Sequence, residues 1–373
     1  MARRAAGLAF VVLFAGLPSC SEIPTAPRVA SVTVSGRITD RDGPPIANMF
    51  VTFRPAAPTP GIPSYTYALT GTDGRYTLKL MQGAYRMTVD PGYGAGYPSA
   101  SVEGIKIGAS DATVDYRYTG VRVSGSVTGL NGGSLSGASV TAYGDNAYAT
   151  AQTTAGHYSI LVPAGPYEMY ADGGGSPAGL PQIGTGRVSV LSDTTIDFAL
   201  TGFAMTATMS YMGGAPLIGA YLEAFGDEVS ANAVTGLDGI ATVYLPAGGY
   251  TIRAIPYPRN IVGPRSLSLS VQADDNVTFD FSGVRWDMTV RDAADGSPLV
   301  GARAVLRQVG GTEAALDDTD ALGRSSFLVR PGVGYDLEVQ WVGGTFYHVA
   351  TVPNLFSAAD TTFDISVSDP VAP

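Results

Sequence analysis

Cysteine and histidine are nearly absent from this chain of 373 residues, which has one cysteine, Cys20, and two histidines, His157 and His348. A lone cysteine forms no intramolecular disulfide, so every folded unit must be stable through its apolar core. Cysteine and histidine are also too few for a zinc site built from those ligands. A Ser/His/Asp or Cys/His active site needs a partnered histidine, and the chain has no G-x-S-x-G motif. We therefore expect no enzyme activity, no metal and no cofactor.

Charged residues are also scarce, at 14% of the chain, and the net charge is −10. Scattered acidic charge argues against nucleic acid as a partner. No long stretch shows the helical period of apolar residues. Glycine (48), proline (25) and tyrosine (20) are plentiful, a profile typical of short strands joined by tight turns. The predicted fold class is all-β.

The first twenty residues have the pattern of a targeting segment. Arg3 and Arg4 precede an apolar run, residues 8–17, which is too short to span a bilayer but is typical of a signal peptide. The run ends in Leu17-Pro18-Ser19-Cys20, which resembles the lipobox of bacterial lipoproteins.

This resemblance implies that residues 1–20 are a lipoprotein signal peptide and that Cys20 carries the lipid. Residues 21–30 then form an extended tether, and Ser21 after the cysteine favours the outer membrane of a bacterial envelope. The alternative is an ordinary cleaved signal with an incidental cysteine.

One phrase occurs four times in the rest of the chain. Its third copy runs from Leu237-Asp238-Gly239 to Pro246-Ala247-Gly248-Gly249-Tyr250, the pattern of a turn, a strand, a second turn and a new strand. The glycine of the first turn recurs at intervals of 82, 83 and 84 residues, as Gly74, Gly156, Gly239 and Gly323. A period of this length indicates a tandem array of small domains.

Each repeat contains short strands, most of which alternate apolar and polar residues, as in a two-sheet sandwich with one buried face per sheet. Junctions such as Thr119-Gly120 leave almost no linker, so we expect a stiff, beaded rod. The predicted β-sandwich domains are residues 31–120, 121–202, 203–283 and 284–369.

The second repeat carries Gly125, Gly137-Ala138 and a run from Gly156-His157-Tyr158 to Pro163-Ala164-Gly165-Pro166-Tyr167. This pattern, found in some form over residues 31–367, resembles the carboxypeptidase regulatory-like family. The resemblance implies a seven-strand prealbumin-like (transthyretin-like) sandwich with a carbohydrate-binding-like fold and no shared catalytic residues. The predicted architecture is a tandem array of four such seven-strand β-sandwich domains.

Aspartates beside turns are the remaining candidates for metal binding. Residues 40–43, 292–296 and 317–320 place carboxylates near turns, and oxygen ligands suit Ca²⁺. None of these segments matches the twelve-residue EF-hand loop, and aspartate followed by glycine is a common turn pair. His157 occupies a position filled by unlike residues in the other repeats, which is typical of a solvent-facing site. No metal site is predicted.

Aromatic residues in loops are the candidates for ligand binding, because exposed rings among polar groups can stack on sugars. The loop after the last strand of the repeated phrase carries such rings in three repeats: Tyr93, Tyr97, Tyr257, Trp341 and Tyr347. The alternative is that Trp341 and its neighbours are core residues on strands that flank a turn. Exposure separates the two, since a buried ring offers no face to a sugar.

The leading hypothesis is a non-enzymatic, lipid-anchored envelope protein that acts as a spacer or protein-interaction module. The alternative is a carbohydrate-binding surface lipoprotein that uses the aromatic loop residues. The partners expected are the membrane, through the lipid anchor, and a polysaccharide or another envelope protein. A regulatory or assembly partner of a separate enzyme is a third hypothesis.

Overall fold

The computed structural model describes residues 31–58, 60–145, 147–174, 179–257, 260–261, 263–311, 314–343 and 346–368. Within these ranges the regular secondary structure is all β-strand apart from one 3-10 turn, η1 (Leu130–Gly132). The predicted all-β class is confirmed. The predicted signal peptide, Cys20 and the tether lie outside the described residues.

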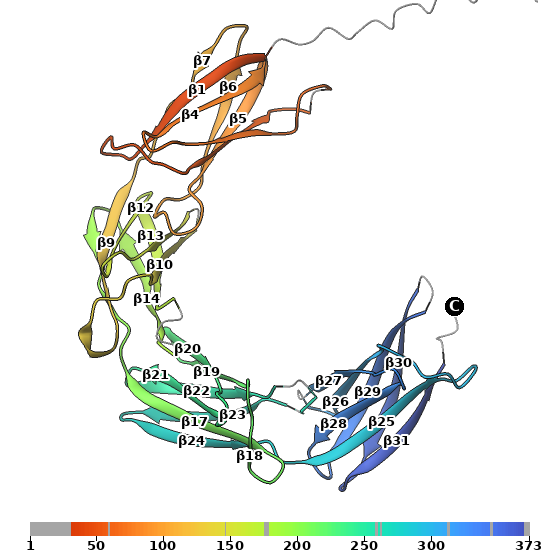
Figure 1. Ribbon diagram of the computed structural model, residues 1–373. Helices are drawn as coiled ribbons and strands as arrows, with labels where there is room; N and C mark the ends of the chain where they lie inside the picture. The colour runs from red at the N-terminus through yellow and green to blue at the C-terminus, as the bar shows by residue number, and fades with distance from the viewer. Residues whose placement is uncertain are drawn as a thin grey trace, which may run out of the picture.

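The strands form β-sandwiches that follow one another along the chain (Figure 1). Sandwich 1 comprises β1 (Ser31–Thr39), β2 (Phe50–Pro55), β3 (Thr66–Leu69), β4 (Arg75–Met81), β5 (Gly83–Asp90), β6 (Ala100–Ile107), β7 (Ala112–Thr113) and β8 (Tyr116–Arg117). Sandwich 2 comprises β9 (Val121–Thr128), β10 (Ser139–Gly144), β11 (Tyr148–Gln152), β12 (His157–Val162), β13 (Gly165–Asp172), β14 (Gln182–Val190), β15 (Thr194–Thr195) and β16 (Phe198–Ala199).

The second half of the chain repeats this order. Sandwich 3 comprises β17 (Phe203–Tyr211), β18 (Ala215–Pro216), β19 (Tyr221–Phe225), β20 (Val229–Val234), β21 (Ile240–Leu245), β22 (Gly248–Ile255), β23 (Arg265–Val271) and β24 (Asp275–Asp280). Sandwich 4 comprises β25 (Val284–Asp292), β26 (Arg303–Gln308), β27 (Ala314–Asp318), β28 (Arg324–Val329), β29 (Gly334–Gly343), β30 (Phe346–Phe356) and β31 (Thr361–Val367).

Each sandwich consists of two sheets: one is built around its first strand and is called the small sheet, and the other is called the four-stranded sheet. In the small sheet, the first strand lies between an antiparallel neighbour, which is β4, β12, β21 or β28, and a parallel last strand. The four-stranded sheets have the orders β3-β2-β5-β6, β11-β10-β13-β14, β20-β19-β22-β23 and β27-β26-β29-β30. Because β14 also pairs with β20, the second and third of these sheets form one eight-stranded sheet.

Alternation along the strands fills the interiors, as in β1, where Val32, Val34 and Ile38 are buried. The buried apolar side chains form four clusters, one in each sandwich. Two residues belong to the cluster of the preceding sandwich: Leu161 packs with the first cluster and Leu328 with the third. The cores are therefore in apolar contact across these two boundaries.

The last strand is broken in the first two sandwiches and continuous in the other two. A side chain on Gly36 would overlap the Val114 carbonyl, which instead accepts a hydrogen bond from the buried Tyr76 hydroxyl (2.6 Å). Gly125 and Tyr158 repeat this arrangement in sandwich 2. The glycine thus makes room for a tyrosine hydroxyl to cap a carbonyl that leaves the ladder.

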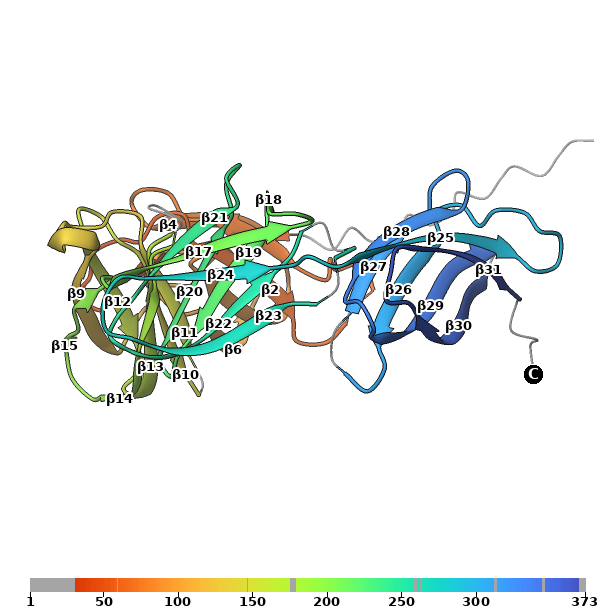
Figure 2. The same ribbon diagram turned by 90° about the horizontal axis from the view of Figure 1, so that it is seen from below.

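The sandwiches follow one another along an arc (Figure 1). The four-stranded sheets face the inside of the arc, whereas β9, β17, β25 and β31 lie on its outer side. Figure 2 shows sandwich 4 extending away from the other three.

Candidate functional site: the joints between sandwiches

Three connections in the four-stranded sheets reach into the next sandwich. We name them joint loops: residues 91–99 between β5 and β6, 173–181 between β13 and β14, and 256–264 between β22 and β23. The matching connection of sandwich 4, between β29 and β30, is only residues 344–345. The joint loops contain most of the aromatic residues that the sequence marks as ligand candidates.

At the first joint, the loop inserts between β11 and β12. The Gly96 N–H donates to the Thr150 carbonyl (2.7 Å), and the Gln152 N–H donates to the Gly94 carbonyl (3.1 Å). On the other side, the Leu161 N–H donates to the Gly96 carbonyl (2.8 Å). A loop of sandwich 1 therefore completes the hydrogen bonding of two edge strands in sandwich 2.

The second joint uses the same contact and adds strand pairing. The Tyr244 N–H donates to the Gly179 carbonyl (2.8 Å). In addition, β14 pairs with β20 through Gln182 opposite Ser230 and Ile183 opposite Val229.

The third joint repeats the contact with asparagine in place of glycine. The Leu328 N–H donates to the Asn260 carbonyl (3.0 Å), and the Asn260 side-chain Nδ2 donates to the Ser326 carbonyl (2.9 Å). Ile261 is buried beside Leu328, with which it forms a parallel bridge.

The receiving amides occupy one equivalent position. The three amides belong to Leu161, Tyr244 and Leu328. Each of these residues forms a non-hydrogen-bonded pair with a residue of the first strand, namely Arg122, Ala204 and Arg285, respectively. Their N–H groups therefore point away from the sheet. Lys79 holds this position in sandwich 1, where its side chain is exposed. No loop carbonyl reaches its amide in the part of the chain that the structure describes.

Glycine is required at the first two contact points for a steric reason. Gly96 and Gly179 have positive φ values of 79° and 84°. A side chain at Gly96 would overlap the Ser159 carbonyl, and one at Gly179 would overlap the Thr242 carbonyl. The loop backbone can therefore approach the edge strand closely only without a Cβ atom.

The first joint also contains a partly buried ionic network around the buried Asp40. Arg122 donates through Nη2 to both carboxylate oxygens of Asp40 (3.0 and 2.9 Å), and the Tyr97 hydroxyl donates to the same carboxylate (2.8 Å). Arg41 forms a two-pronged ion pair with Asp193, whose carboxylate also accepts from the Arg122 amide (2.9 Å). The network thus joins β-strand ends of sandwich 1 to the first and last strands of sandwich 2.

The network shifts the pKa values of its members. Burial alone would raise the pKa of Asp40, but the hydrogen bonds from Arg122 and Tyr97 outweigh it and hold that pKa below its ordinary value. Burial, together with the Asp40 carboxylate, raises the pKa of Tyr97 to about 12. The hydrogen bond from Arg41 lowers the pKa of Asp193. All these groups keep their paired protonation states at neutral pH.

The predicted ligand residues fall into different environments. Tyr93 is 72% exposed, and its hydroxyl is hydrogen-bonded to Ser139 of sandwich 2 (2.8 Å). Tyr97 is partly buried against Tyr118 and serves the first joint. Tyr257 is 53% exposed at the third joint.

The structure differs from the prediction that Trp341 is an exposed ring for ligand binding. Trp341 lies on β29 in the core of sandwich 4, where it is only 8% exposed, because only two residues separate β29 from β30 and the tryptophan remains on a strand. Trp341 is therefore no exposed platform for a sugar. The side chain of Tyr347, on β30, lies outside the described residues.

Sequence reasoning missed Asp40, Arg41, Arg122 and Asp193 as joint residues, because a turn aspartate and a strand arginine in different repeats show no local pattern. A local signal did exist for the joint loops, in the parallel occurrence of Gly96-Tyr97-Pro98 and Gly179-Leu180-Pro181. Within the described ranges, no three of His, Cys, Asp and Glu are grouped to hold a metal ion. No helix among the described residues is long and apolar enough to cross a membrane.

Comparison with known proteins identifies no family. No family model matches the sequence, and no curated protein matches it.

Solved structures give distant matches. The TIE protein of Bacillus anthracis is 15% identical, with 85% of this chain and 68% of that chain covered and a TM-score of 0.22. The minor pilin GBS52 of Streptococcus agalactiae is 14% identical over 46% of this chain and 98% of its own, with a TM-score of 0.27. The BcpA major pilin subunit of Bacillus cereus is 10% identical over 90% and 99%, with a TM-score of 0.19. Values this low establish neither a shared overall arrangement nor a shared role.

Proposed function

We propose that this protein is a non-enzymatic spacer whose sandwiches are held in a defined curve by their joints. The observation that carries the proposal is the repeated contact at the three joints, where a loop carbonyl meets the outward amide of the next sandwich's edge strand. A chain of domains with only short linkers would bend at each boundary, whereas a backbone contact made by a separate loop adds a second point of attachment. Two attachments per boundary restrict the bending angle.

Amide hydrogen exchange on the full chain tests this proposal. We expect the amides of Leu161, Tyr244 and Leu328 to exchange at least about 100-fold more slowly than that of Lys79. This factor corresponds to a free energy of about 3 kcal/mol for opening a joint. Similar exchange at all four positions would mean that the joints are open in solution. Small-angle scattering would then show a flexible string instead of a single arc.

An interaction role is supported at sandwich 1. Its exposed apolar side chains lie on and beside β2 and β3, next to β4, and expose 44–58% of their surface: Phe50, Tyr65, Tyr67 and Leu69. Tyr65 stacks on Tyr67. Contiguous exposed apolar side chains are typical of protein contacts. A photo-crosslinking residue at Tyr67 should capture a protein partner in cells, whereas one at the exposed Leu322 should not. Equal capture at both positions would contradict this role.

The envelope location is the further part of this proposal. It rests on the lipobox-like Leu17-Pro18-Ser19-Cys20, with residues 1–20 as signal, 21–30 as tether, and an outer-membrane anchor. The repeats, as domains 31–120, 121–202, 203–283 and 284–369, are assigned to the carboxypeptidase regulatory-like family by their motif. Incorporation of radiolabelled palmitate in a bacterial host, abolished by Cys20→Ser, is the expected result. Equal labelling of the variant would remove the anchor from the proposal.

Carbohydrate binding is the second candidate, and the exposed tyrosines near the first joint favour it. Tyr93 lies close to Tyr143 and Tyr148, which are about half exposed and have ring centroids 5.1 Å apart. Titration with a panel of polysaccharides should then give saturable binding that Tyr148→Ala weakens and Tyr257→Ala does not. No saturable binding of any polysaccharide to the unmodified chain would contradict carbohydrate binding and leave the spacer as the only proposed function.

A further inference from the structure

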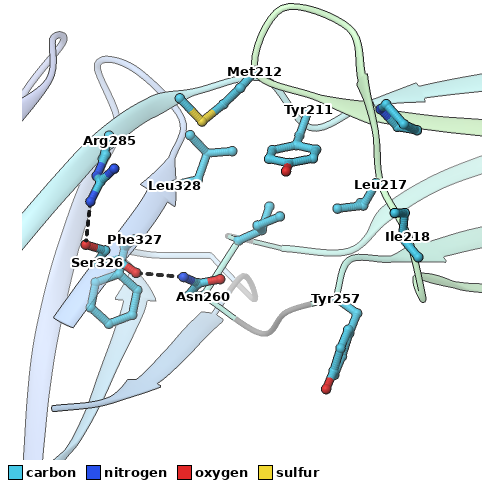
Figure 3. Close-up of a pocket in the computed structure, with 12 residues that line it drawn as sticks. Tyr211, Met212, Leu217, Ile218, Tyr257, Asn260, Arg285, Ser326, Phe327 and Leu328 are labelled. Atoms are coloured by element: carbon cyan, nitrogen blue, oxygen red, sulfur yellow. Dashed lines mark hydrogen bonds between the residues drawn. The ribbon is translucent and has the colours of Figure 1, made fainter. Parts of the chain in front are cut away.

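A hollow of about 390 Å³ lies at the third joint (Figure 3). Its wall is mostly apolar and comes from both sandwiches, with Tyr211, Leu217 and Ile218 from sandwich 3 and Phe327 and Leu328 from sandwich 4. Figure 3 shows Tyr211, Leu217 and Leu328 around one space, with Tyr257 at its lower side. This volume lies at the lower end of the range of small-ligand pockets, which is about 300–1,000 Å³.

The hollow stands where the first joint has its ionic network. Ile38 and Met209 make the same hydrogen bond to Gly74 and Gly239, so Tyr211 takes the place of Asp40, and Met212 that of Arg41. Arg285 takes the place of Arg122, and its amide donates to Asp360 as that of Arg122 does to Asp193. The third joint therefore has an arginine, Arg285, at the position of Arg122, but no carboxylate at the position of Asp40.

Two polar side chains of the wall can form further hydrogen bonds. The Asn260 Oδ1 atom is buried with no hydrogen-bond partner among the described residues, although Nδ2 of the same side chain is bonded. Arg285 donates through Nε to Asp287 and through Nη2 to Ser326, and its Nη1 has no hydrogen bond to another described residue. The buried Asn260 Oδ1 atom can accept a hydrogen bond from a ligand, and the guanidinium Nη1 of Arg285 can donate one to a carboxylate.

We propose that this hollow binds the carboxyl end of a peptide whose last residue is apolar. Such an end carries the three required groups close together: an amide N–H for Asn260, an apolar side chain for the hollow, and a carboxylate for Arg285. A free amino acid has an ammonium group in place of the amide, and this charge would stand near the guanidinium. The pocket therefore selects an acylated nitrogen.

Calorimetric titration of the full chain with N-acetyl-L-phenylalanine tests the proposal. We expect saturable binding that is about tenfold weaker for N-acetyl-L-phenylalanine amide and for free L-phenylalanine, since one charge-assisted hydrogen bond is worth about that factor. Arg285→Gln should remove the preference for the acid, while Arg122→Gln, the matched change at the first joint, should leave it intact.

Two further variants keep the result interpretable if Arg285→Gln fails to fold. Ile218→Trp, at the exposed rim, should block all three probes by filling the hollow. Tyr211→Asp should abolish binding of the acid by placing a second carboxylate near Arg285, in addition to that of Asp287. No saturable heat, equal affinity for acid and amide, or binding that survives Ile218→Trp would each overturn the proposal.

Discussion

The first and third joints use one backbone contact and opposite side-chain chemistry. In both, an edge-strand amide, Leu161 or Leu328, donates to a carbonyl of the preceding joint loop. Around it, the first joint places Asp40, Arg122 and Tyr97 in a partly buried network, whereas the third has Tyr211, Arg285 and Ile261 around a hollow.

The comparison shows which part of a joint is general. The backbone contact needs only an outward amide and a loop that can approach it, so it survives changes of every neighbouring side chain. The network adds orientation, because a buried carboxylate held by three directed hydrogen bonds has one geometry. We therefore expect the first joint to be the stiffer of the two.

The largest expected effect comes from Arg122→Met. The change leaves the Asp40 carboxylate buried without its cation, which costs about 3 kcal/mol. Amide exchange at Leu161 should then be faster by a factor of about 100. Arg285→Met, the matched change at the third joint, should alter exchange at Leu328 by less than about threefold, because Arg285 is half exposed. Equal acceleration at both joints would remove the distinction between them.

Gly96→Ala is expected to come second. The new methyl group would overlap the Ser159 carbonyl, and alanine at φ 79° is itself strained, for a combined cost of about 2 kcal/mol. Gly92→Ala is the control for strain alone, since Gly92 also has a positive φ but no atom within 4 Å of the added carbon. Leu161 exchange should respond to the first change by about 30-fold and not to the second. An effect of Gly92→Ala as large as that of Gly96→Ala would contradict the close-approach argument.

Tyr211→Asp should bring the third joint closer to the first. It restores a carboxylate opposite Arg285, and a partly exposed pair of this kind contributes about 1 kcal/mol. Exchange at Leu328 should slow by about fivefold while exchange at Leu161 stays unchanged. Faster exchange at Leu328 would show that the carboxylate does not reach Arg285.

Acid should open the first joint before the third. Because the folded-state pKa of Asp40 is depressed, its contribution is complete above the unfolded value of about 3.9 and is lost as the pH falls through the lower folded value. Spin labels at Lys106 and Leu191, in a Cys20→Ser chain, should keep a narrow distance distribution down to about pH 4 and broaden below it. Labels at Gln272 and Leu322 report the third joint, and earlier broadening there would reverse the expected order.

The repeat and its strands were accessible from sequence because their causes are local. Glycines such as Gly74 and Gly239 have positive φ values in the turns that the repeated phrase predicts, and alternation in β1 buries the expected side chains. The aromatic candidates were harder to place. Tyr93 and Trp341 both stand in or beside the equivalent loop, and only the loop length decides that one is exposed and the other buried.

By itself, the sequence determined an all-β repeat protein, since turn glycines and two-residue periodicity act over a few residues. The side-chain pairings at the joints were decided by tertiary structure alone. Arg122 meets Asp40 across 82 positions because β9 begins where the end of β1 and the first joint loop converge. Arg285 meets no such carboxylate, since Tyr211 stands in its place. Whether an arginine closes a network or borders a hollow depends on a residue of the preceding sandwich, and no local pattern encodes that pairing.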